Sequence, residues 1–331
     1  MSEPCRILVT GGNGVVGMAL KAIQNDFGGY EFVFSSSSVC NLCRMDEVIR
    51  YVADVKPTHV LHTAAVSGGI GLSMSSPATV LRDNVLMNFS VLEAARAQKV
   101  QKVVMTLSTG MYPVDAPNPI KEEYIHNGPA HPSNYSYAYA KRLVEPMIRA
   151  YRQEYGMCVV GVVPNGIYGE HDCFNYDDAT VLASLVRRFS EHRHDGEPIV
   201  IWGDGRPLRE FTYAQDIARA YMWVLEHYDA PEVLHIGTTE EHSIGEIARM
   251  IAEEAGVNVT RLMFDTSKPS GQLRKSTDNS RFVGLSGFTY TPLKEGLRRT
   301  VRWFCEAFDH DPRSIRMARK VRRTGDKGVG A

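Results

Sequence analysis

Residues 7–17 read ILVTGGNGVVG, and this stretch decides the fold. An apolar run that suits a buried strand is followed at once by Gly11, Gly14 and Gly17 and then by a helix-length segment. Three glycines at this spacing let the chain turn tightly, let the backbone approach a pyrophosphate and let the helix pack closely on the strand. The N-terminus of that helix also offers N–H groups to phosphates. The stretch predicts a dinucleotide-binding turn, and an ordinary strand–helix turn is the alternative.

Four further apolar runs follow in the first half of the chain, EFVFSS, THVLHTA, KVVMTLS and CVVGVVP, with helix-length amphipathic segments between them. This alternation predicts an α/β fold with a Rossmann-like, doubly wound parallel sheet. The rhythm breaks after about residue 166, where we expect a smaller, discontinuous C-terminal domain. The expected limits are 1–165 for the dinucleotide-binding domain, with segments returning from about 210–240, then 166–320 for the second domain and 321–331 for a disordered tail.

The overall composition excludes several classes of function. The 37 basic and 38 acidic residues nearly cancel, so nothing global favours a nucleic acid or an anionic membrane as partner. The apolar runs are shorter than the roughly 18 to 20 residues that cross a bilayer, and the N-terminus lacks a signal pattern. We therefore expect a cytoplasmic protein with reduced cysteines. Cys40 and Cys43 form a lone CxxC without a second pair or suitably spaced histidines, so no metal is expected.

The end of the second predicted strand bears on the choice of cofactor. NAD-specific sites usually carry an acidic residue there, which holds the ribose 2′-hydroxyl. This chain has four serines at positions 35 to 38, with no carboxylate to repel a 2′-phosphate and several hydroxyls to bind one. The pattern favours NADP, although a polar surface loop would look the same and no nearby arginine decides between the two.

A second pattern, SNYSYAYAKR, places Tyr137 and Lys141 four positions apart. On a helix this spacing puts both side chains on one face. A phenol with a pKa of about 10 is a poor acid–base group at neutral pH, and we expect the neighbouring ammonium to lower that pKa. Tyr137 could then give a proton to an alkoxide as a hydride arrives. Ser108, at the end of the fourth predicted strand, could bind the same carbonyl oxygen.

With this Ser-Tyr-Lys trio the chain resembles the extended short-chain dehydrogenases. From Arg6 to about Phe308 it is similar to the GDP-L-fucose synthase family, the GDP-4-keto-6-deoxymannose 3,5-epimerase-4-reductases. The resemblance is carried by HTAAVSGG, PIKEEYIHNGPAHPSNYSYAYAK, YGEHDCFN, IWGDGRPLREFTY, FDTSKPSGQLRK and WFCEAF. It implies an NADPH-dependent enzyme that acts on a GDP-linked 4-keto-6-deoxy sugar, bound mainly by residues 166–320.

The resemblance also implies roles for individual residues. Ser108, Tyr137 and Lys141 would carry the reduction. The cofactor would lie against Gly11, Asn13, Gly14, Val15, Val16, Gly17, Ser36, Ser37, Asn41, Leu42, Ala64, Ala65, Tyr137, Lys141 and Pro164. The substrate would lie against Ser108, Thr109, Gly110, Thr180, Val181, Leu185, Arg188, Trp202, Arg209 and Lys275. A surface ion pair with Glu210 or Asp204 is the alternative for Arg209, and core packing is the alternative for Trp202.

The chain departs from the family at the groups that epimerise C3 and C5. The family uses a cysteine and a histidine, and this sequence has Gly110 and Thr180 at those positions. Neither can shuttle protons near neutral pH. The family's PTN segment reads Pro164-Asn165-Gly166, so an active-site wall residue also differs. His171 and Cys173 are candidates for compensation, but the family-like YGEHDCFN block already accounts for the histidine. We therefore predict a C4 reductase of a hexose or heptose that has lost epimerase activity.

Three other functions remain open from the sequence. The first is a complete bifunctional GDP-L-fucose synthase in which other residues epimerise. The second is a nucleotide-sugar dehydratase or 4-epimerase, which the Gly110-Met111 pair does not favour because a dehydratase typically has an acidic pair there. The third is a non-catalytic NADP-binding sensor or scaffold, for which an intact Tyr-Lys pair would be unnecessary. By analogy with the family we expect a homodimer formed through the helices around the Tyr-Lys pair.

Overall fold

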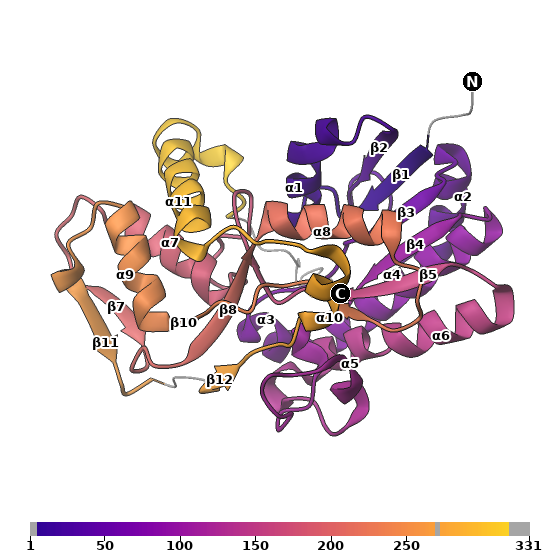
Figure 1. The fold of residues 1–331 in the computed structure, drawn as a ribbon. Coiled ribbons are helices and arrows are strands. Elements are labelled where there is room, and N and C mark those ends of the chain that lie inside the picture. Colours follow the sequence, from indigo (N-terminus) through magenta and orange to yellow (C-terminus); the bar gives the residue numbers. More distant parts are fainter. Residues whose placement is uncertain (1–4, 269–271, 318–331) are drawn as a thin grey trace, which may run out of the picture.

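The computed structural model describes residues 5–268 and 272–317 (Figure 1). Six parallel strands form the main sheet in the order β2-β1-β3-β4-β5-β9. They are β1 (Cys5–Thr10), β2 (Tyr30–Ser35), β3 (His59–His62), β4 (Lys102–Thr106), β5 (Val159–Val163) and β9 (Leu234–His235). The strands are rich in β-branched residues and β5 is buried throughout, as expected for a sheet covered on both faces.

Helices cover both faces of this sheet. One face is packed by α2 (Met45–Val55), α4 (Pro77–Ala97) and α6 (Val144–Tyr155), whose apolar side chains form one cluster with it. The other face is packed by α1 (Val15–Ile23), α8 (Ala214–His227) and α10 (Ser280–Ser286), which form a second cluster. Two shorter helices, α3 (Ile70–Ser75) and α5 (Tyr135–Arg142), lie beside α4. The predicted α/β class and Rossmann-like sheet are thus confirmed.

The remaining elements gather on the other side of the molecule, around α7, α9 and α11 (Figure 1). Here β8 (Leu208–Tyr213) pairs with β10 (Glu241–Ser243), β12 (Arg274–Lys275) and β6 (Gly166–Tyr168), and β7 (Ile199–Trp202) pairs with β11 (Leu262–Asp265). A third apolar cluster joins α7 (Val181–Glu191), α9 (Ile244–Glu254) and α11 (Leu293–His310) to these strands. The short 3-10 helices are Gln24–Asp26, Thr109–Met111, Glu122–His126, Pro132–Asn134, Val259–Arg261 and Pro312–Ser314.

The predicted strands appear within two residues of their expected limits. The domain limits themselves stay a prediction, and the expected tail at 321–331 lies outside the described residues. Among residues 5–268 and 272–317, none of the helices combines the length and the apolar character that a membrane crossing needs. Within the same ranges, no three His, Cys, Asp or Glu side chains are grouped so that they could hold a metal ion.

Candidate active site

The glycine turn lies between β1 and α1, at the point where the sheet order runs one way to β2 and the other way to β3. Gly11 has φ +73°, and a Cβ atom there would lie 2.8 Å from the Cα of Ala64. A Cβ on Gly17 would lie 2.5 Å from the carbonyl oxygen of Gly11. Both positions therefore require glycine, and Gly14 begins α1 as its N-cap residue. The close turn and the free N–H groups of the helix end fit a dinucleotide pyrophosphate.

The other residues predicted to contact the cofactor lie at the carboxyl ends of the same strands. Ser36 and Ser37 follow β2, Ala64 and Ala65 follow β3, and Pro164 follows β5. Of the remaining members, Asn13 in the turn is exposed, Val15 is partly exposed and Val16 is buried. Asn41 and Leu42 lie shortly before α2. Ligands of open α/β sheets bind in the crevice outside these strand ends, so the members of the predicted set that follow β2, β3 and β5 lie where such a ligand would bind.

The predicted catalytic trio comes from two elements. Ser108 follows β4 and caps the 3-10 helix Thr109–Met111, where its Oγ accepts a hydrogen bond from the backbone N–H of Gly110. Tyr137 and Lys141 lie on α5, and the Lys141 Nζ is 6.0 Å from the centre of the Tyr137 ring. Lys141 donates a hydrogen bond of 2.8 Å to the carbonyl oxygen of Thr106, the last residue of β4. This bond ties α5 to the end of the strand that precedes Ser108.

The pKa of Tyr137 differs from the sequence-based expectation. Burial raises it above the usual value for a tyrosine, and a hydrogen bond with Ser108 opposes that rise only in part. Lys141 does not lower it as expected, because the ammonium is directed at Thr106 and is itself fully buried. Burial lowers the pKa of Lys141 to about 8. Tyr137 is therefore a protonated phenol at neutral pH, which suits it to donate a proton.

The backbone of Gly110 lies close to Ser108 and Tyr137 of this trio. A Cβ atom on Gly110 would lie 3.3 Å from Nδ2 of Asn134, 3.4 Å from Oγ of Ser108 and 3.7 Å from Cε1 of Tyr137. We call the place bounded by these three atoms the Gly110 notch. Any side chain at position 110 would enter it, so the residue type at this position decides what can reach the atoms next to Ser108 and Tyr137.

Asn134 was not among the predicted site residues. It ends the 3-10 helix Pro132–Asn134, and its Oδ1 accepts a hydrogen bond of 2.7 Å from the buried hydroxyl of Ser73 on α3. Its Nδ2 thereby faces the Gly110 notch. Asn134 lies just three positions before Tyr137 in the sequence, but the contact with Ser73 spans 61 residues, so no local pattern identified it.

Two cations lie side by side on the smaller sheet. Lys275 of β12 and Arg209 of β8 are direct partners in the parallel pairing. Burial and the charge of Arg209 lower the pKa of Lys275 to about 8. Arg209 donates to the backbone oxygen of Leu208, whereas the carboxylate of Glu210 accepts from Asn165 and Thr277. Like charges placed opposite each other destabilise a sheet, so this pair fits a site that receives an anion.

The other predicted substrate residues lie around α7 and β7. Trp202, at the end of β7, is 64% exposed, so the alternative of core packing is wrong for this side chain. Arg188 of α7 donates to the backbone oxygen of Val200. Thr180 is exposed and caps α7, and its Oγ1 accepts from the N–H of Ala183. The two remaining members differ in exposure: Val181 is 44% exposed, and Leu185 is buried in the third apolar cluster.

The changed wall residue Asn165 belongs to a buried polar network. Its Nδ2 donates 3.0 Å to the carboxylate of Glu210, which also accepts from the backbone N–H and the hydroxyl of Thr277. Its Oδ1 accepts from Thr212. Burial raises the pKa of Glu210 to about 7 despite these bonds. The network joins the end of β5 to β8 and to Thr277, which lies two positions after Lys275.

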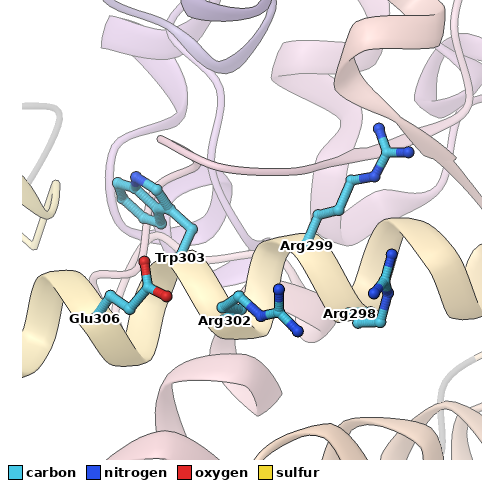
Figure 2. A pocket seen from close by; sticks show the side chains of 5 residues that line it. All are labelled: Arg298, Arg299, Arg302, Trp303 and Glu306. Atoms are coloured by element: carbon cyan, nitrogen blue, oxygen red, sulfur yellow. The ribbon is translucent and has the colours of Figure 1, made fainter.

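The two suggested replacements for the missing epimerase groups have other surroundings. His171, with φ 64°, contacts the ring of Trp303 on α11 at 4.6 Å between centres, and Cys173 is buried. A shallow cavity of about 210 Å³ lies on the same helix and is shown in Figure 2; it is lined by Arg298, Arg299, Arg302, Trp303 and Glu306. None of the predicted site residues lines it.

Comparisons with known proteins show the family to which the chain belongs. Residues 7–237 match the model of the NAD dependent epimerase/dehydratase family. The chain is 36% identical to the GDP-L-fucose synthase of Dictyostelium discoideum over 92% of its own length and 96% of that protein. It matches the crystal structure of a GDP-L-fucose synthetase from Naegleria fowleri bound to NADP with a TM-score of 0.88 and 32% identity, over 96% of this chain and 97% of that one. A GDP-mannoheptose C4 reductase from Campylobacter jejuni with NADP bound matches with a TM-score of 0.81 and 26% identity, over 92% and 99%.

Proposed function

Because the chain belongs to the NAD dependent epimerase/dehydratase family and, within it, to the GDP-L-fucose synthase family, we propose that it is an NADPH-dependent C4 reductase of a GDP-linked 4-keto-6-deoxy sugar that does not epimerise C3 or C5. Reduction of a GDP-linked sugar with NADPH follows from its relatives, since the Naegleria fowleri and Campylobacter jejuni structures both contain NADP. The position of the ketone and the lack of epimerisation are the finer parts of the proposal.

The residues around α5 have separate tasks in this reaction. Ser108 and Tyr137 bind the C4 carbonyl oxygen by hydrogen bonds, which orients the ketone and polarises it. NADPH, when bound, supplies the hydride that adds to C4. Tyr137 gives its phenolic proton to the same oxygen, which becomes the new hydroxyl. Lys141 positions Tyr137, because its ammonium binds the carbonyl oxygen of Thr106 and thereby holds α5 against the end of the strand that precedes Ser108.

The Gly110 notch is the observation that carries the proposal. Epimerisation needs an acid–base side chain that reaches a carbon next to the carbonyl, and position 110 faces the two residues that would bind the carbonyl oxygen. Glycine supplies no such group. Thr180, the other position where the family has an acid–base residue, has a hydroxyl that already accepts a hydrogen bond from its own helix. Both facts favour reduction alone.

The test is to incubate the protein with NADPH and GDP-4-keto-6-deoxymannose in D2O, and to follow the absorbance of NADPH and the NMR spectrum of the sugar ring. We expect NADPH to be consumed and no deuterium to enter C3 or C5. Exchange at both carbons would instead support the bifunctional enzyme. If NADPH is not consumed, the same assay with a GDP-linked 4-keto-heptose tests the longer sugar, which the likeness to the mannoheptose reductase makes the second candidate.

The GDP part of the substrate would bind at the smaller sheet. Arg209 and Lys275 are neighbouring cations suited to the pyrophosphate, and the exposed indole of Trp202 offers a flat surface for a sugar or base. Arg188 lies beside the same strand as Trp202. Isothermal titration with GDP alone tests this part: an Arg209→Ala variant should lose at least tenfold in affinity. Unchanged GDP affinity in this variant would show that the pyrophosphate binds at another place.

A homodimer is the proposed assembly. α4 and α5 contact each other, and Leu86 and Phe89 of α4, Tyr139 of α5 and the adjoining Leu143 are each about 40% exposed. Exposed apolar side chains gathered on adjacent helices suit a symmetric interface. Analytical ultracentrifugation should give twice the chain mass, and Phe89→Glu should give the monomer. A wild-type monomer at micromolar concentration would contradict the proposal.

A further inference from the structure

An ammonium group lies where the glycine turn meets the end of β2. Lys21 is on α1, and its Nζ is 3.3 Å from Oδ1 of Asn13 in the turn. The same Nζ lies 5.1 Å from the centre of the Phe34 ring, in the next-to-last residue of β2. Phe34 itself abuts the turn, since a Cβ atom on Gly12 would lie 2.8 Å from the Cβ of Phe34. The two contacts of Nζ place the ammonium between the turn and β2.

The charge of Lys21 has no carboxylate partner in the part of the chain that the structure describes. Its contacts are an amide oxygen, the sulfur of Met18 at 3.9 Å and an aromatic face. Beyond Phe34, β2 ends at Ser35, and the hydroxyls of Ser36 and Ser38 lie 2.8 Å apart in the turn that follows. The described part of the chain thus places a cation without a carboxylate partner near the end of β2 that the hydroxyls follow, and both kinds of group bind phosphate.

In a Rossmann fold, the 2′ position of the adenosine ribose lies at the end of the second strand. We propose that Lys21 binds the 2′-phosphate of the dinucleotide and makes this chain prefer the phosphorylated cofactor. The inference rests on the proposed function only in taking NADP as the cofactor, and it names a residue from the first helix rather than from the loop after β2. Asn13 positions the ammonium through its side-chain oxygen.

Two other cations are the alternatives to Lys21. Arg44, shortly before α2, lies 4.0 Å from a carboxylate oxygen of Asp46 and 3.8 Å from one of Glu47. Arg316 approaches from the C-terminal side and donates 2.9 Å to the backbone oxygen of Asn13. Lys21 differs from both in that its ammonium lies over the ring of Phe34 near the end of β2, and Arg44 is the matched control.

The test measures binding without any sugar, so its result does not depend on the reaction. Dissociation constants for NADPH and for NADH are determined by titration calorimetry for the wild type, Lys21→Gln, Lys21→Arg and Arg44→Gln. We expect Lys21→Gln to weaken the affinity for NADPH about tenfold to a hundredfold and to change the affinity for NADH by less than about twofold. Lys21→Arg should keep most of the preference, and Arg44→Gln should keep all of it. Unchanged NADH binding also shows that the variant is folded.

Each contrary result has its own meaning. An equal loss for both dinucleotides, or no loss for either, overturns the role of Lys21. If only Arg44→Gln selectively loses affinity for NADPH, the 2′-phosphate binds at Arg44. That result also overturns the role of Lys21. A wild type that binds NADH as tightly as NADPH overturns the preference itself, while the reductase proposal stands. If the wild type binds neither dinucleotide, the protein does not use this cofactor, and both proposals are overturned.

Discussion

Gly110 faces Tyr137: a Cβ atom on the glycine would lie 3.7 Å from Cε1 of the tyrosine ring, with only hydrogen-bonding groups of Asn134 and Ser108 closer. Position 110 therefore controls the space next to the proposed proton donor. Glycine places no side-chain atom against these groups, and any larger residue at this position would contact them. The difference between a reductase and an epimerase-reductase would then lie in one side chain of this loop and its counterpart at the start of α7.

The first prediction concerns the double variant Gly110→Cys with Thr180→His. It restores the acid–base groups of the family, so deuterium should enter C3 or C5 of the 4-keto sugar in D2O, while the wild type gives no exchange. NMR of the sugar ring, recorded without NADPH, measures this incorporation of deuterium. Reduction should slow, because the new Cβ lies 3.3 Å from Asn134 Nδ2 and the neighbours must move. The single variants serve as controls. No exchange in a folded double variant would mean that these two positions do not face the sugar.

The second prediction concerns Tyr137→Phe. Removal of the phenolic proton should lower kcat by about a hundredfold to ten-thousandfold, since this is the usual contribution of a positioned acid. NADPH affinity should change little. Tyr155→Phe, which alters an exposed tyrosine at the end of α6, is the matched control and should keep full activity. If Tyr137→Phe retained the wild-type kcat, another group would have to protonate the alkoxide.

The third prediction concerns Lys275→Met. The native pKa of Lys275 is lowered from 10.5 to about 8, so the charged side chain destabilises the native state fully below pH 8. That cost disappears as the pH rises towards 10.5, because the native lysine is then neutral while the unfolded one still binds a proton. The variant should gain about 1 to 3 kcal/mol in free energy of unfolding at pH 7 and lose this advantage by pH 10.5.

Urea denaturation at several pH values measures that gain, and GDP affinity should fall in the same variant. Lys294→Met, at a 66% exposed side chain, should change stability by less than about 0.5 kcal/mol. A Lys275→Met protein that is less stable than the wild type at pH 7 would show that the ammonium has a compensating partner.

The fourth prediction concerns Glu210→Gln. The native pKa of Glu210 is raised from 4.5 to about 7, so the native carboxyl binds its proton more tightly than the unfolded one. Wild-type stability from this group is therefore greatest below pH 4.5 and is lost as the pH rises through 7. Relative to the wild type, Glu210→Gln should become more stable by about 1 to 3 kcal/mol between pH 4.5 and pH 8.

Glu241→Gln is the control for that measurement. Its ion pair with Arg274 lowers the pKa of Glu241, so its stabilising effect is present at neutral pH and is lost as the pH falls. The two variants should thus differ from the wild type with opposite pH dependence. Parallel curves would mean that Glu210 is ionised normally in the native protein.

The fifth prediction concerns Gly17→Ala. The added Cβ would lie 2.5 Å from the oxygen of Gly11 and 2.6 Å from the Cα of Gly12, and both are backbone atoms that cannot turn aside. We expect a loss of about 1 to 3 kcal/mol in stability and weaker binding of NADPH and NADH alike. Gly28→Ala, where no atom lies within 4 Å, should be close to neutral. Thermal unfolding and cofactor titration compare the two.

Much of the fold could be predicted because its signals are local. The glycine turn, the apolar strands and the helix with Tyr137 and Lys141 each depend on residues within a few positions of one another. Steric limits and side-chain periodicity act at that range, so a short stretch is enough to recognise them. The strand that precedes Ser108 was predictable for the same reason.

The parts that the sequence did not reveal are contacts between distant segments. Ser73 holds Asn134 across 61 residues, and the buried carboxylate of Glu210 meets Thr277 across 67. The pKa of Tyr137 was expected to fall and instead rises, because burial depends on the layers that close over α5 and not on the four-residue spacing to Lys141.

The sequence by itself determined which chemistry the chain can carry: a glycine turn for a dinucleotide, a Ser-Tyr-Lys trio, and no thiol at position 110. The tertiary structure decided how these groups act. It brought Gly110 against Tyr137, set Lys275 beside Arg209, exposed Trp202 and placed Lys21 between the turn and β2. The physical reason is that residue type and local spacing decide which reactions a side chain can take part in. Its pKa and protonation state depend on burial and on neighbouring charges, and these arise only when distant segments pack together.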